Sequence, residues 1–245
     1  MTIKPDLSGH VALVTGGSRG IGAAIATALA EAGAAVAVNY LERSAKADAV
    51  VAGIKSRGGR AIAVAADVSQ AASVAEMVDH AAFALGPVDI LVNNAGIAIV
   101  RGIDELTEAE FDATIAINLK SAFLCTQAVL PAMRAKQWGR IVNISSGAAR
   151  GAGAIGVHYN TSKAGMEGLT RGYAARLVKE GITVNAVAPS LIETDMMRGR
   201  PELAARIPLG RMGQPDEVAQ AVLMVLGNDY MTGQTIVLNG GMAFG

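Results

Sequence analysis

The stretch V-A-L-V-T-G-G-S-R-G-I-G-A, from Val11 to Ala23, joins an apolar run to a glycine-rich turn and then to an Ala-rich segment with helical periodicity. This order predicts a buried strand, a tight turn and a helix. The turn glycines permit a sharp change of direction, a close backbone approach and close helix packing; they are Gly16, Gly20 and Gly22. A helix that begins after such a turn offers unpaired N–H groups to a pyrophosphate. The spacing is not G-x-G-x-x-G, so the turn by itself also fits a plain strand-to-helix connection.

The composition fits a globular α/β protein. The chain has 245 residues, of which 51% are hydrophobic and 17% are charged, as expected for buried parallel strands. No linker, repeat or low-complexity tract divides it, so we predict a single domain over residues 1–245. Lys plus Arg equal Asp plus Glu, and this balance gives no reason to expect nucleic acid or an anionic membrane as a partner.

Two features bear on location and metal binding. Cys125 is the only cysteine, so no intrachain disulfide can form, which is consistent with a reducing compartment. The N-terminus lacks the basic and apolar regions of a signal peptide, and no run reaches the ~18 apolar residues of a membrane span. We therefore expect a cytoplasmic protein. His10 and His80 have no ligand spacing with Cys125, so no metal site is expected.

Apolar runs and amphipathic stretches alternate along the rest of the chain. Further strands are predicted at 34–39, 61–66, 88–92, 139–145, 181–188 and 234–238, and helices at 44–57, 69–85 with Ser69 as the cap, 108–135, up to 179 after the fifth strand, and 215–226. This alternation predicts a doubly wound parallel sheet with helices on both faces. The irregular stretch 190–213 has the composition of a lid over a site.

The end of the second predicted strand bears on the choice of cofactor. An acidic residue there would bind the ribose 2′-OH of NAD, but the chain has Asn39 and Tyr40. Arg19 in the glycine turn and Arg43 nearby would suit a 2′-phosphate, whereas Glu42 would oppose one. NADP(H) is therefore predicted, with NAD(H) as the alternative. Arg43 alone fits a solvated charge at a helix start equally well.

Polar residues also follow the third and fourth predicted strands. Asp67 and Val68 end the third, and the sequence N-N-A-G at 93–96 ends the fourth. The C-terminal ends of parallel strands meet at one edge of a sheet, where ligands bind, so Asp67 and Asn94 should lie beside the glycine turn. Two Asn and a Gly would also make a simple turn.

Asn118 lies among apolar residues in the middle of a predicted helix. That helix begins with Thr107 and Glu110, at the spacing of a capping box. Asn is a poor helix former, and a buried amide needs hydrogen-bond partners. Asn118 is therefore either a structural staple or part of a polar relay.

Tyr159 and Lys163 lie four residues apart, a spacing that stacks two side chains on one helix face. A phenol with a pKa near ~10 is a poor proton shuttle at neutral pH. An ammonium ~4 Å away, at an effective dielectric of ~20, would favour the phenolate by up to ~4 kcal/mol, or about three pKa units. With Ser146 at the end of the fifth strand, the pair predicts acid–base chemistry. Alone, it also fits a packed tyrosine beside a solvated lysine.

These residues together resemble the short-chain dehydrogenase/reductase family over nearly the whole chain. The motifs occur in the family's order and spacing: T-G-G-S-R-G-I-G at 15–22, D-V at 67–68, N-N-A-G at 93–96, Asn118, I-S-S at 144–146, Y-N-T-S-K at 159–163 and N-A-V-A-P at 185–189. Within the family, segments 207–219 and 230–241 are most similar to β-ketoacyl-[acyl-carrier-protein] reductases, although many other members share them. The resemblance implies a single-domain Rossmann fold with a seven-stranded sheet, and a homotetramer.

The resemblance also implies roles for single residues. Ser146 would hydrogen-bond the substrate oxygen and Tyr159 would pass the proton. Lys163 would lower the tyrosine pKa and hold the nicotinamide ribose, and Asn118 would position a water. The predicted cofactor contacts, from the residues above and from the resemblance, are Gly16, Ser18, Arg19, Gly20, Ile21, Gly22, Asn39, Arg43, Asp67, Val68, Asn94, Ala95, Gly96, Tyr159, Lys163, Pro189, Ile192 and Thr194.

Further residues would surround the substrate: Ala148, Arg150, Ile155, Val157, Met196 and Met197. His158 adjoins Tyr159, but neighbouring helix positions point apart, so we expect it at the pocket rim or the surface. Trp138 is expected to serve packing rather than function.

We therefore expect an oxidoreductase that transfers hydride from NADPH to a carbonyl, with a 3-oxoacyl thioester of fatty acid biosynthesis as the first substrate and another ketone or secondary alcohol, or NAD, as the alternative. An acyl carrier protein is a candidate partner, but the positions where such reductases carry basic residues hold Gln137 and Glu180. A cofactor-binding protein without catalysis would lack one of the four catalytic residues. A kinase- or GTPase-like protein would need a Gly-Lys-Ser/Thr ending to its glycine turn.

Overall fold

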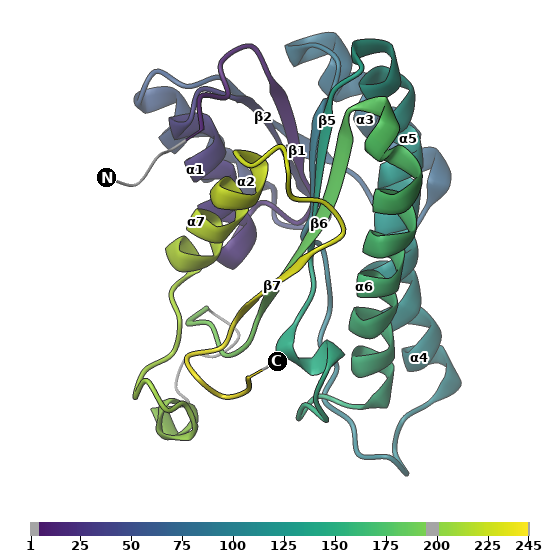
Figure 1. Cartoon of the computed structure of the whole chain (residues 1–245), viewed down its shortest axis with the longest axis vertical. Coiled ribbons are helices and arrows are strands. Elements are labelled where there is room, and N and C mark those ends of the chain that lie inside the picture. The colour runs from purple at the N-terminus through teal and green to yellow at the C-terminus, as the bar shows by residue number, and fades with distance from the viewer. Residues whose placement is uncertain (1–4, 195–200, 245) are drawn as a thin grey trace.

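The computed structural model describes residues 5–194 and 201–244. Its centre is a sheet of seven parallel strands in the order β3-β2-β1-β4-β5-β6-β7 (Figure 1). The strands are β1 Val11–Val14, β2 Ala35–Tyr40, β3 Ala61–Ala65, β4 Ile90–Asn93, β5 Gly139–Ile144, β6 Ile182–Pro189 and β7 Thr235–Leu238. The predicted doubly wound parallel sheet is confirmed, and each strand lies within a few residues of its predicted bounds.

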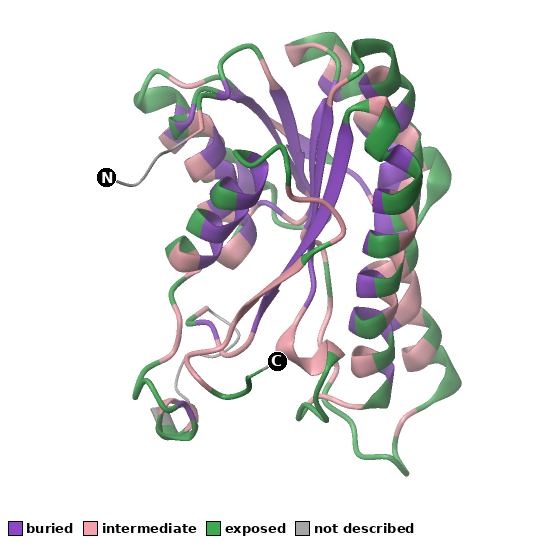
Figure 2. Ribbon diagram, viewed as in Figure 1, coloured by how far each residue is buried: buried purple, intermediate pink, exposed green. Residues whose placement is uncertain are grey.

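Helices cover both faces of the sheet. One face carries α1 (Gly20–Glu31), α2 (Ser44–Ser56) and α7 (Pro215–Leu226), and the other carries α3 (Ala71–Leu85), α5 (Ser121–Lys136) and α6 (Val157–Leu177) (Figure 1). α4 (Glu108–Ile115) leads into α5, and short 3-10 turns cover Gly147–Ala149, Val178–Glu180 and Pro201–Arg206. Figure 2 shows the strands buried between these layers and the outward helix faces exposed. The predicted lid, 190–213, includes residues 195–200, which lie outside the described residues together with Met196 and Met197.

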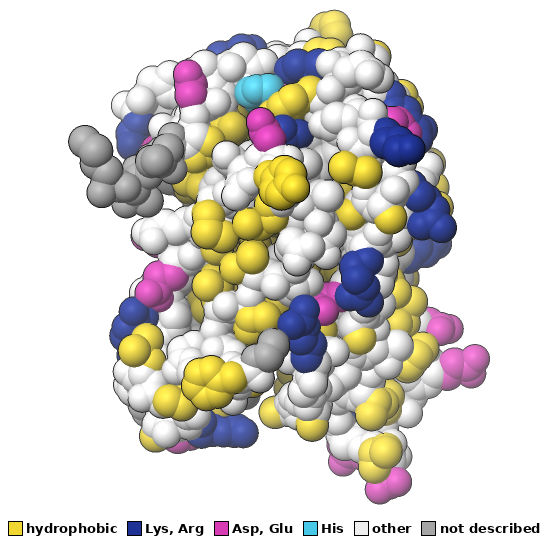
Figure 3. Space-filling view, viewed as in Figure 1, with side chains coloured by type: hydrophobic (Ala, Val, Ile, Leu, Met, Phe, Trp, Pro, Cys, Tyr) yellow, Lys and Arg dark blue, Asp and Glu magenta, His cyan; other side chains and the backbone are white. Residues whose placement is uncertain are grey.

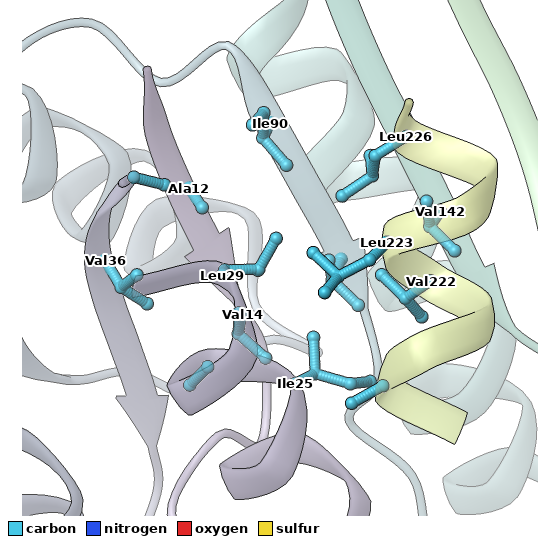
Figure 4. Close-up of a cluster of buried hydrophobic side chains, with 14 of the residues drawn as sticks. Ala12, Val14, Ile25, Leu29, Val36, Ile90, Val142, Val222, Leu223 and Leu226 are labelled. Atoms are coloured by element: carbon cyan, nitrogen blue, oxygen red, sulfur yellow. The ribbon is translucent and has the colours of Figure 1, made fainter. Parts of the chain in front are cut away.

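Alternate residues of each strand pack against opposite helix layers, as the period of two requires. Val14, Ile90 and Val142 face α1 and α7, whereas Leu13, Leu91 and Ile141 face the other layer. Figure 4 shows Ile25 and Leu29 of α1 and Val222, Leu223 and Leu226 of α7 directed into one core with these strand residues. Apolar side chains on both faces explain why the strands form continuous hydrophobic runs in the sequence.

The long helix predicted at 108–135 is interrupted. Thr107 and Glu110 form the predicted capping box at its start, but the segment Ala116–Lys120 is a π-helix between α4 and α5. A π turn rarely forms without a local reason and often marks a functional site; here it contains Asn118. The predicted cap at Ser69 is wrong. Gln70 is the N-cap of α3. The Ser69 backbone N–H and hydroxyl instead both donate to Asp67 Oδ1.

The strand order reverses next to β1, whose neighbours are β2 on one side and β4 on the other. Successive connections from this point pass to opposite faces, so the loops that follow β1 and β4 diverge and leave a crevice at the carboxyl edge. The glycine turn follows β1 and Asn94 follows β4. The fold therefore gathers the predicted ligand-binding segments at one edge.

Candidate active site

The turn between β1 and α1 has a backbone that only small residues permit. Gly16 and Gly20 have φ angles of +61° and +52°, in the left-handed region. A Cβ on Gly22 would lie 2.4 Å from the Gly16 carbonyl oxygen and 2.5 Å from Asn94 Nδ2. The start of α1 therefore packs directly on the turn, and its first N–H groups face the space above the sheet edge. This cradle fits the phosphates of a dinucleotide.

Two asparagines hold the glycine turn in place. Asn94 Nδ2 donates to the carbonyls of Thr15 and Gly16, at 2.9 and 3.1 Å. Asn39 Oδ1 accepts from the Gly16 N–H at 3.0 Å, and its Nδ2 lies 3.2 Å from the Ala66 carbonyl oxygen. Asn39 is only 2% exposed. The Asn39 side chain therefore holds the turn in place, and its predicted contact with the cofactor stays a prediction.

The charged residues predicted at the cofactor stand on helix starts and strand ends. Arg19 and Arg43 are the exposed N-cap residues of α1 and α2, and within the described parts of the chain neither guanidinium makes a hydrogen bond or an ion pair. Asp67 Oδ1 is used by Ser69. The remaining predicted residues near the turn are Ser18 and Ile21, which flank Arg19 and Gly20, and the buried Val68.

A second group of predicted contacts approaches the turn from β6. Pro189 is the last residue of β6, and Ile192 pairs with Gly213 in an isolated bridge. Thr194 Cγ2 lies 3.4 Å from the place a Cβ on Gly20 would take. The segment after β6 therefore lies against the glycine turn, so that a ligand bound at the turn would also be within reach of this segment.

The segment after β4 reaches the catalytic helix. A Cβ on Gly96 would lie 3.3 Å from Asn118 Oδ1 and 3.8 Å from Lys163 Nζ. Ala95 precedes it and donates its N–H to the Thr15 hydroxyl at 3.0 Å. The structure thus brings Ala95 and Gly96, two predicted cofactor contacts, next to two of the predicted catalytic side chains.

Ser146 and Tyr159 meet at the end of β5. Tyr159 is the third residue of α6, in the first turn as predicted, and the Ser146 side chain lies close enough to lower the pKa of its phenol. The Ser146 hydroxyl also accepts from the Ala148 N–H at 3.2 Å. Two neighbouring hydroxyl groups can both bind a single carbonyl oxygen placed beside them.

Burial controls the ionisation of the lysine. Lys163 is 4% exposed, and its Nζ donates to the Ile144 carbonyl oxygen at 2.8 Å. Nζ lies 5.9 Å from the centroid of the Tyr159 ring, so the two groups share a helix face. Burial lowers the pKa of Lys163 to about 8.

The tyrosine does not follow the sequence-based expectation. Burial raises the pKa of Tyr159 above its ordinary value, and the hydrogen bond from Ser146 offsets only part of that rise. The expected lowering by Lys163 is wrong for the protein alone, because the ammonium is aimed at the Ile144 carbonyl. In this arrangement Tyr159 is a neutral phenol, the form that donates a proton.

Asn118 is fully engaged by its surroundings. Its Oδ1 accepts from Ile97 N at 2.8 Å, and its Nδ2 donates to Ile97 O at 3.0 Å and to Ser162 Oγ at 3.2 Å. Ser162 in turn donates to the Tyr159 carbonyl at 2.8 Å. The staple alternative is confirmed for the side chain, which ties the loop after β4 to the catalytic helix. Its predicted place in a water relay stays a prediction.

Two residues of the catalytic helix differ from their expected parts. His158 is fully buried and contacts the Ile99 carbonyl through Nε2 at 3.0 Å, so its expected place at the rim or surface is wrong. It lies at the first turn of α6, where the loop after β4 passes.

Sequence reasoning missed Ser162, which gives no signal beyond its place before Lys163. A buried polar chain from Asn93 through Asn143 to Thr170 also fixes α6 on β4 and β5.

The helical run Glu108–Lys136 is apolar and long enough to span a membrane by length and composition alone. In the structure it packs on α3, α6, β4 and β5, as a core helix of a globular protein does. Within residues 5–194 and 201–244, no group of three or more His, Cys, Asp or Glu side chains could hold a metal ion.

Comparisons with known proteins agree with this geometry. The family model described as short chain dehydrogenase matches residues 10–203. The chain is 44% identical to a 3-oxoacyl-[acyl-carrier-protein] reductase of Synechocystis sp., covering 96% of this chain and 98% of that one. It is 43% identical to the (2S)-[(R)-hydroxy(phenyl)methyl]succinyl-CoA dehydrogenase subunit BbsD of Thauera aromatica, with 96% and 97% covered.

Solved structures give the same result. The blue fluorescent protein from a metagenomic library, in complex with NADPH, superposes with a TM-score of 0.92 at 40% identity, over 98% of this chain and all of that one. A putative gluconate dehydrogenase from Agrobacterium tumefaciens superposes with a TM-score of 0.92 at 36% identity, over 97% of each chain. Similar proteins thus act on different substrates.

Proposed function

Because the chain belongs to the short-chain dehydrogenase/reductase family and is an oxidoreductase, we propose that it reduces a carbonyl compound with NADPH. The observation that carries this proposal is the placement of Ser146 directly after β5 and of Tyr159 and Lys163 at the start of α6, at the same sheet edge as the glycine turn. At this edge a turn that can bind phosphates lies on the same side of the sheet as a side chain that can donate a proton.

The residues of the cradle fit a nicotinamide dinucleotide. The closeness of Gly22 to Gly16 leaves no room for a side chain between α1 and the turn, so backbone N–H groups can approach a pyrophosphate. Thr194, Gly96 and Lys163 would hold the nicotinamide half; Thr194 lies against the glycine turn and Gly96 lies beside Lys163, which supports this assignment. When bound, the reduced cofactor supplies the hydride.

The side chains of this protein would act on the carbonyl oxygen. Negative charge grows on that oxygen as the carbonyl carbon is reduced, and Ser146 and Tyr159 both offer hydroxyl donors to it. Tyr159 then gives up its proton, which produces the alcohol. Lys163 places a positive charge near the resulting phenolate, where it stabilises the ionised form. Asn118 and Ser162 connect the loop after β4 to the first turn of α6 through their hydrogen bonds.

Three observations support NADP(H) over NAD(H). The strand-end position that binds the 2′-OH in NAD-dependent proteins is occupied by Asn39, whose amide is committed to the glycine turn. Arg19 and Arg43 are exposed cations without partners within the described residues. A structural relative is in complex with NADPH. NAD(H) remains the alternative because Glu42 lies beside Arg43.

The proposed substrate is a 3-oxoacyl thioester, with another ketone or a secondary alcohol as the alternative. The names of the two curated relatives support a thioester: one acts on an acyl-carrier-protein substrate and the other on a coenzyme A substrate. Glu180 is bound by Arg134 at 2.6 and 3.2 Å, so the position expected to be basic is neutralised. This pairing favours a free thioester over one carried by an acidic protein. The proposed cytoplasmic location and part in fatty acid biosynthesis rest on the likeness to the reductases named above and not on this pairing.

The proposed assembly is a homotetramer. A shallow hollow of about 360 Å³ lies on α5, α6 and the π turn, lined by Ile115, Leu119, Lys120, Phe123, Gly165 and Leu169. Phe123 is 44% exposed and adds apolar surface to this hollow, and contiguous exposed apolar surface is typical of protein–protein contacts. Light scattering at several protein concentrations tests the assembly, and a monomer at all of them contradicts it.

The test of the function has two stages. Titration with NADPH and NADH should give tighter binding of NADPH, and equal or tighter binding of NADH would overturn the cofactor assignment. Acetoacetyl-coenzyme A and simple ketones are then assayed with the preferred cofactor. Turnover of the thioester supports the first substrate, and turnover of ketones alone selects the alternative. No turnover of any carbonyl or alcohol would favour a cofactor-binding protein without catalysis.

A further inference from the structure

The loop between β5 and α6 (residues 145–156) contains Ser146 near its start and leads into the first turn of α6, which carries Tyr159 (Figure 1). It is tied to α6 at two points besides the approach of Ser146 to Tyr159. One tie is made by Asn160, next to Tyr159, and the other by Arg150 and Glu167. Neither tie belongs to the catalytic or cofactor-binding set described above.

The side-chain amide of Asn160 binds backbone carbonyl groups of the loop. Both hydrogens of Nδ2 are used, because Nδ2 lies 2.6 Å from the Gly151 carbonyl oxygen and 2.6 Å from that of Ala152. The Oδ1 atom is buried and has no hydrogen-bond partner within the described residues. The amide is thus oriented by its donors alone, and a carboxylate of the same shape would face two carbonyl oxygens with no proton to offer.

Arg150 and Glu167 form the second tie. Arg150 Nε lies 3.1 Å from Glu167 Oε2. The carboxylate is on α6, one turn beyond Lys163, and its side chain is only 6% exposed, whereas that of Arg150 is 47% exposed. Glu167 Oε1 has no hydrogen-bond partner in the described parts of the chain. A buried carboxylate depends strongly on its single cationic partner, so this contact holds the arginine more firmly than an exposed ion pair would.

The turn between Ser146 and Arg150 transmits these constraints to the site. Ala149 N donates to Ser146 O at 2.9 Å, and Arg150 N donates to Gly147 O at 3.3 Å. With the Ala148 N–H on the Ser146 hydroxyl, these contacts make one closed 3-10 turn. A displacement of Arg150 therefore moves the Ser146 hydroxyl relative to Tyr159, which is held separately by α6.

We propose that Asn160, Arg150 and Glu167 are positioning residues that clamp this loop on the catalytic helix and so set the distance between the Ser146 and Tyr159 hydroxyls. The proposal rests on the proposed carbonyl reduction. It assigns the two ties to the chemical step rather than to cofactor binding, because the glycine turn and its supports lie on other elements. Misplacing a catalytic group by about 1 Å can cost up to ~10²-fold in rate.

The test compares Arg150→Met, Arg150→Lys and Asn160→Asp with a control, Arg134→Met. The control removes an arginine Nε–glutamate Oε2 pair of the same type, Arg134–Glu180, at the far end of α6. For each variant, kcat, KM for NADPH and hydrogen exchange of the amides of residues 146–156 are measured. Thermal unfolding shows whether a variant still folds.

The clamp predicts that Arg150→Met and Asn160→Asp lower kcat by about 3- to 30-fold with KM for NADPH unchanged, and that exchange of the loop amides becomes faster. Arg150→Lys, which keeps the charge, should recover part of kcat, and Arg134→Met should change neither quantity.

Faster loop exchange with unchanged kcat would overturn the positioning role, and unchanged exchange would show that the contacts do not hold the loop. A loss of kcat in Arg134→Met equal to that in Arg150→Met would also overturn it. A wild-type protein without carbonyl turnover would instead overturn the proposed function, and the exchange measurement would still decide whether the clamp exists.

Discussion

Lys163 Nζ lies 5.9 Å from the centre of the Tyr159 ring and is directed at the Ile144 carbonyl oxygen, 2.8 Å away. The two predicted catalytic side chains therefore share a helix face, and no hydrogen bond joins them within the described residues. Burial then dominates both groups: it lowers the pKa of the ammonium and raises the pKa of the phenol. Each shift favours the uncharged form of its group in the protein without cofactor.

Replacing Lys163 with Met should stabilise the cofactor-free protein at neutral pH. The folded pKa of about 8 lies below the ordinary 10.5, so the folded state pays for holding a charged lysine at pH 7. That cost is about 3 kcal/mol. It is absent above pH ~10.5 and reaches its full size as the pH falls through ~8.

Urea unfolding at neutral and alkaline pH measures this effect. The wild type should gain stability relative to Lys163→Met as the pH rises between these two values, and Lys55→Met, on the exposed side of α2, should show no such trend. A Lys163→Met protein that is less stable than wild type by the same amount at both pH values would show that burial does not penalise the charge.

The phenol of Tyr159 should titrate above the ordinary range in the cofactor-free protein. Burial raises its pKa, and Ser146 lowers it only in part. Ultraviolet difference titration of the wild type and Tyr159→Phe isolates the phenolate signal of this one residue. Ser146→Ala should move the signal further up, since the hydrogen bond that favours the phenolate is lost. A signal that appears near neutral pH would restore the lysine-controlled tyrosine expected from the sequence.

Gly22→Ala should weaken NADPH binding and destabilise the fold. The added methyl group would meet the Gly16 carbonyl oxygen at 2.4 Å, a distance that forces α1 away from the turn. Overpacking of this kind costs about 1–3 kcal/mol. The matched control is Gly53→Ala in α2, where a Cβ meets only the far end of Arg57 at 3.9 Å.

The control should be neutral or more stable by up to about 1 kcal/mol, because alanine favours helix. Calorimetric titration with NADPH and thermal unfolding of both variants check the prediction. Tight NADPH binding by Gly22→Ala would contradict the role of the glycine turn as the cofactor cradle.

Most of the fold follows from the sequence because it depends on hydrophobic periodicity. The strands around Val14, Val38 and Val92 are apolar on both faces, and only a sheet covered by two helix layers buries such runs. The capping box at Thr107 and the start of α7 at Pro215 are local signals that hold in the structure. The π turn around Asn118 has no such signal, since it depends on contacts with Ile97 and Ser162.

The site follows from the sequence as a set of residues, but less well as a set of contacts. The positions of Gly22, Ser146 and Tyr159 at one sheet edge could be predicted from strand ends. The commitment of Asn39 to the glycine turn and the burial of His158 could not, because each depends on which backbone atoms pass nearby in space. The direction of Lys163 likewise depends on the register of α6 against β5.

The central claim is that Tyr159 donates the proton, whereas the phosphates of the cofactor bind at the turn between β1 and α1, and Tyr159→Phe tests it most directly. Steady-state reduction of the best carbonyl substrate and NADPH binding are measured side by side for this variant and the wild type. The account predicts a loss of at least about 10²-fold in kcat with NADPH affinity unchanged. A variant that retains near-wild-type turnover would contradict it.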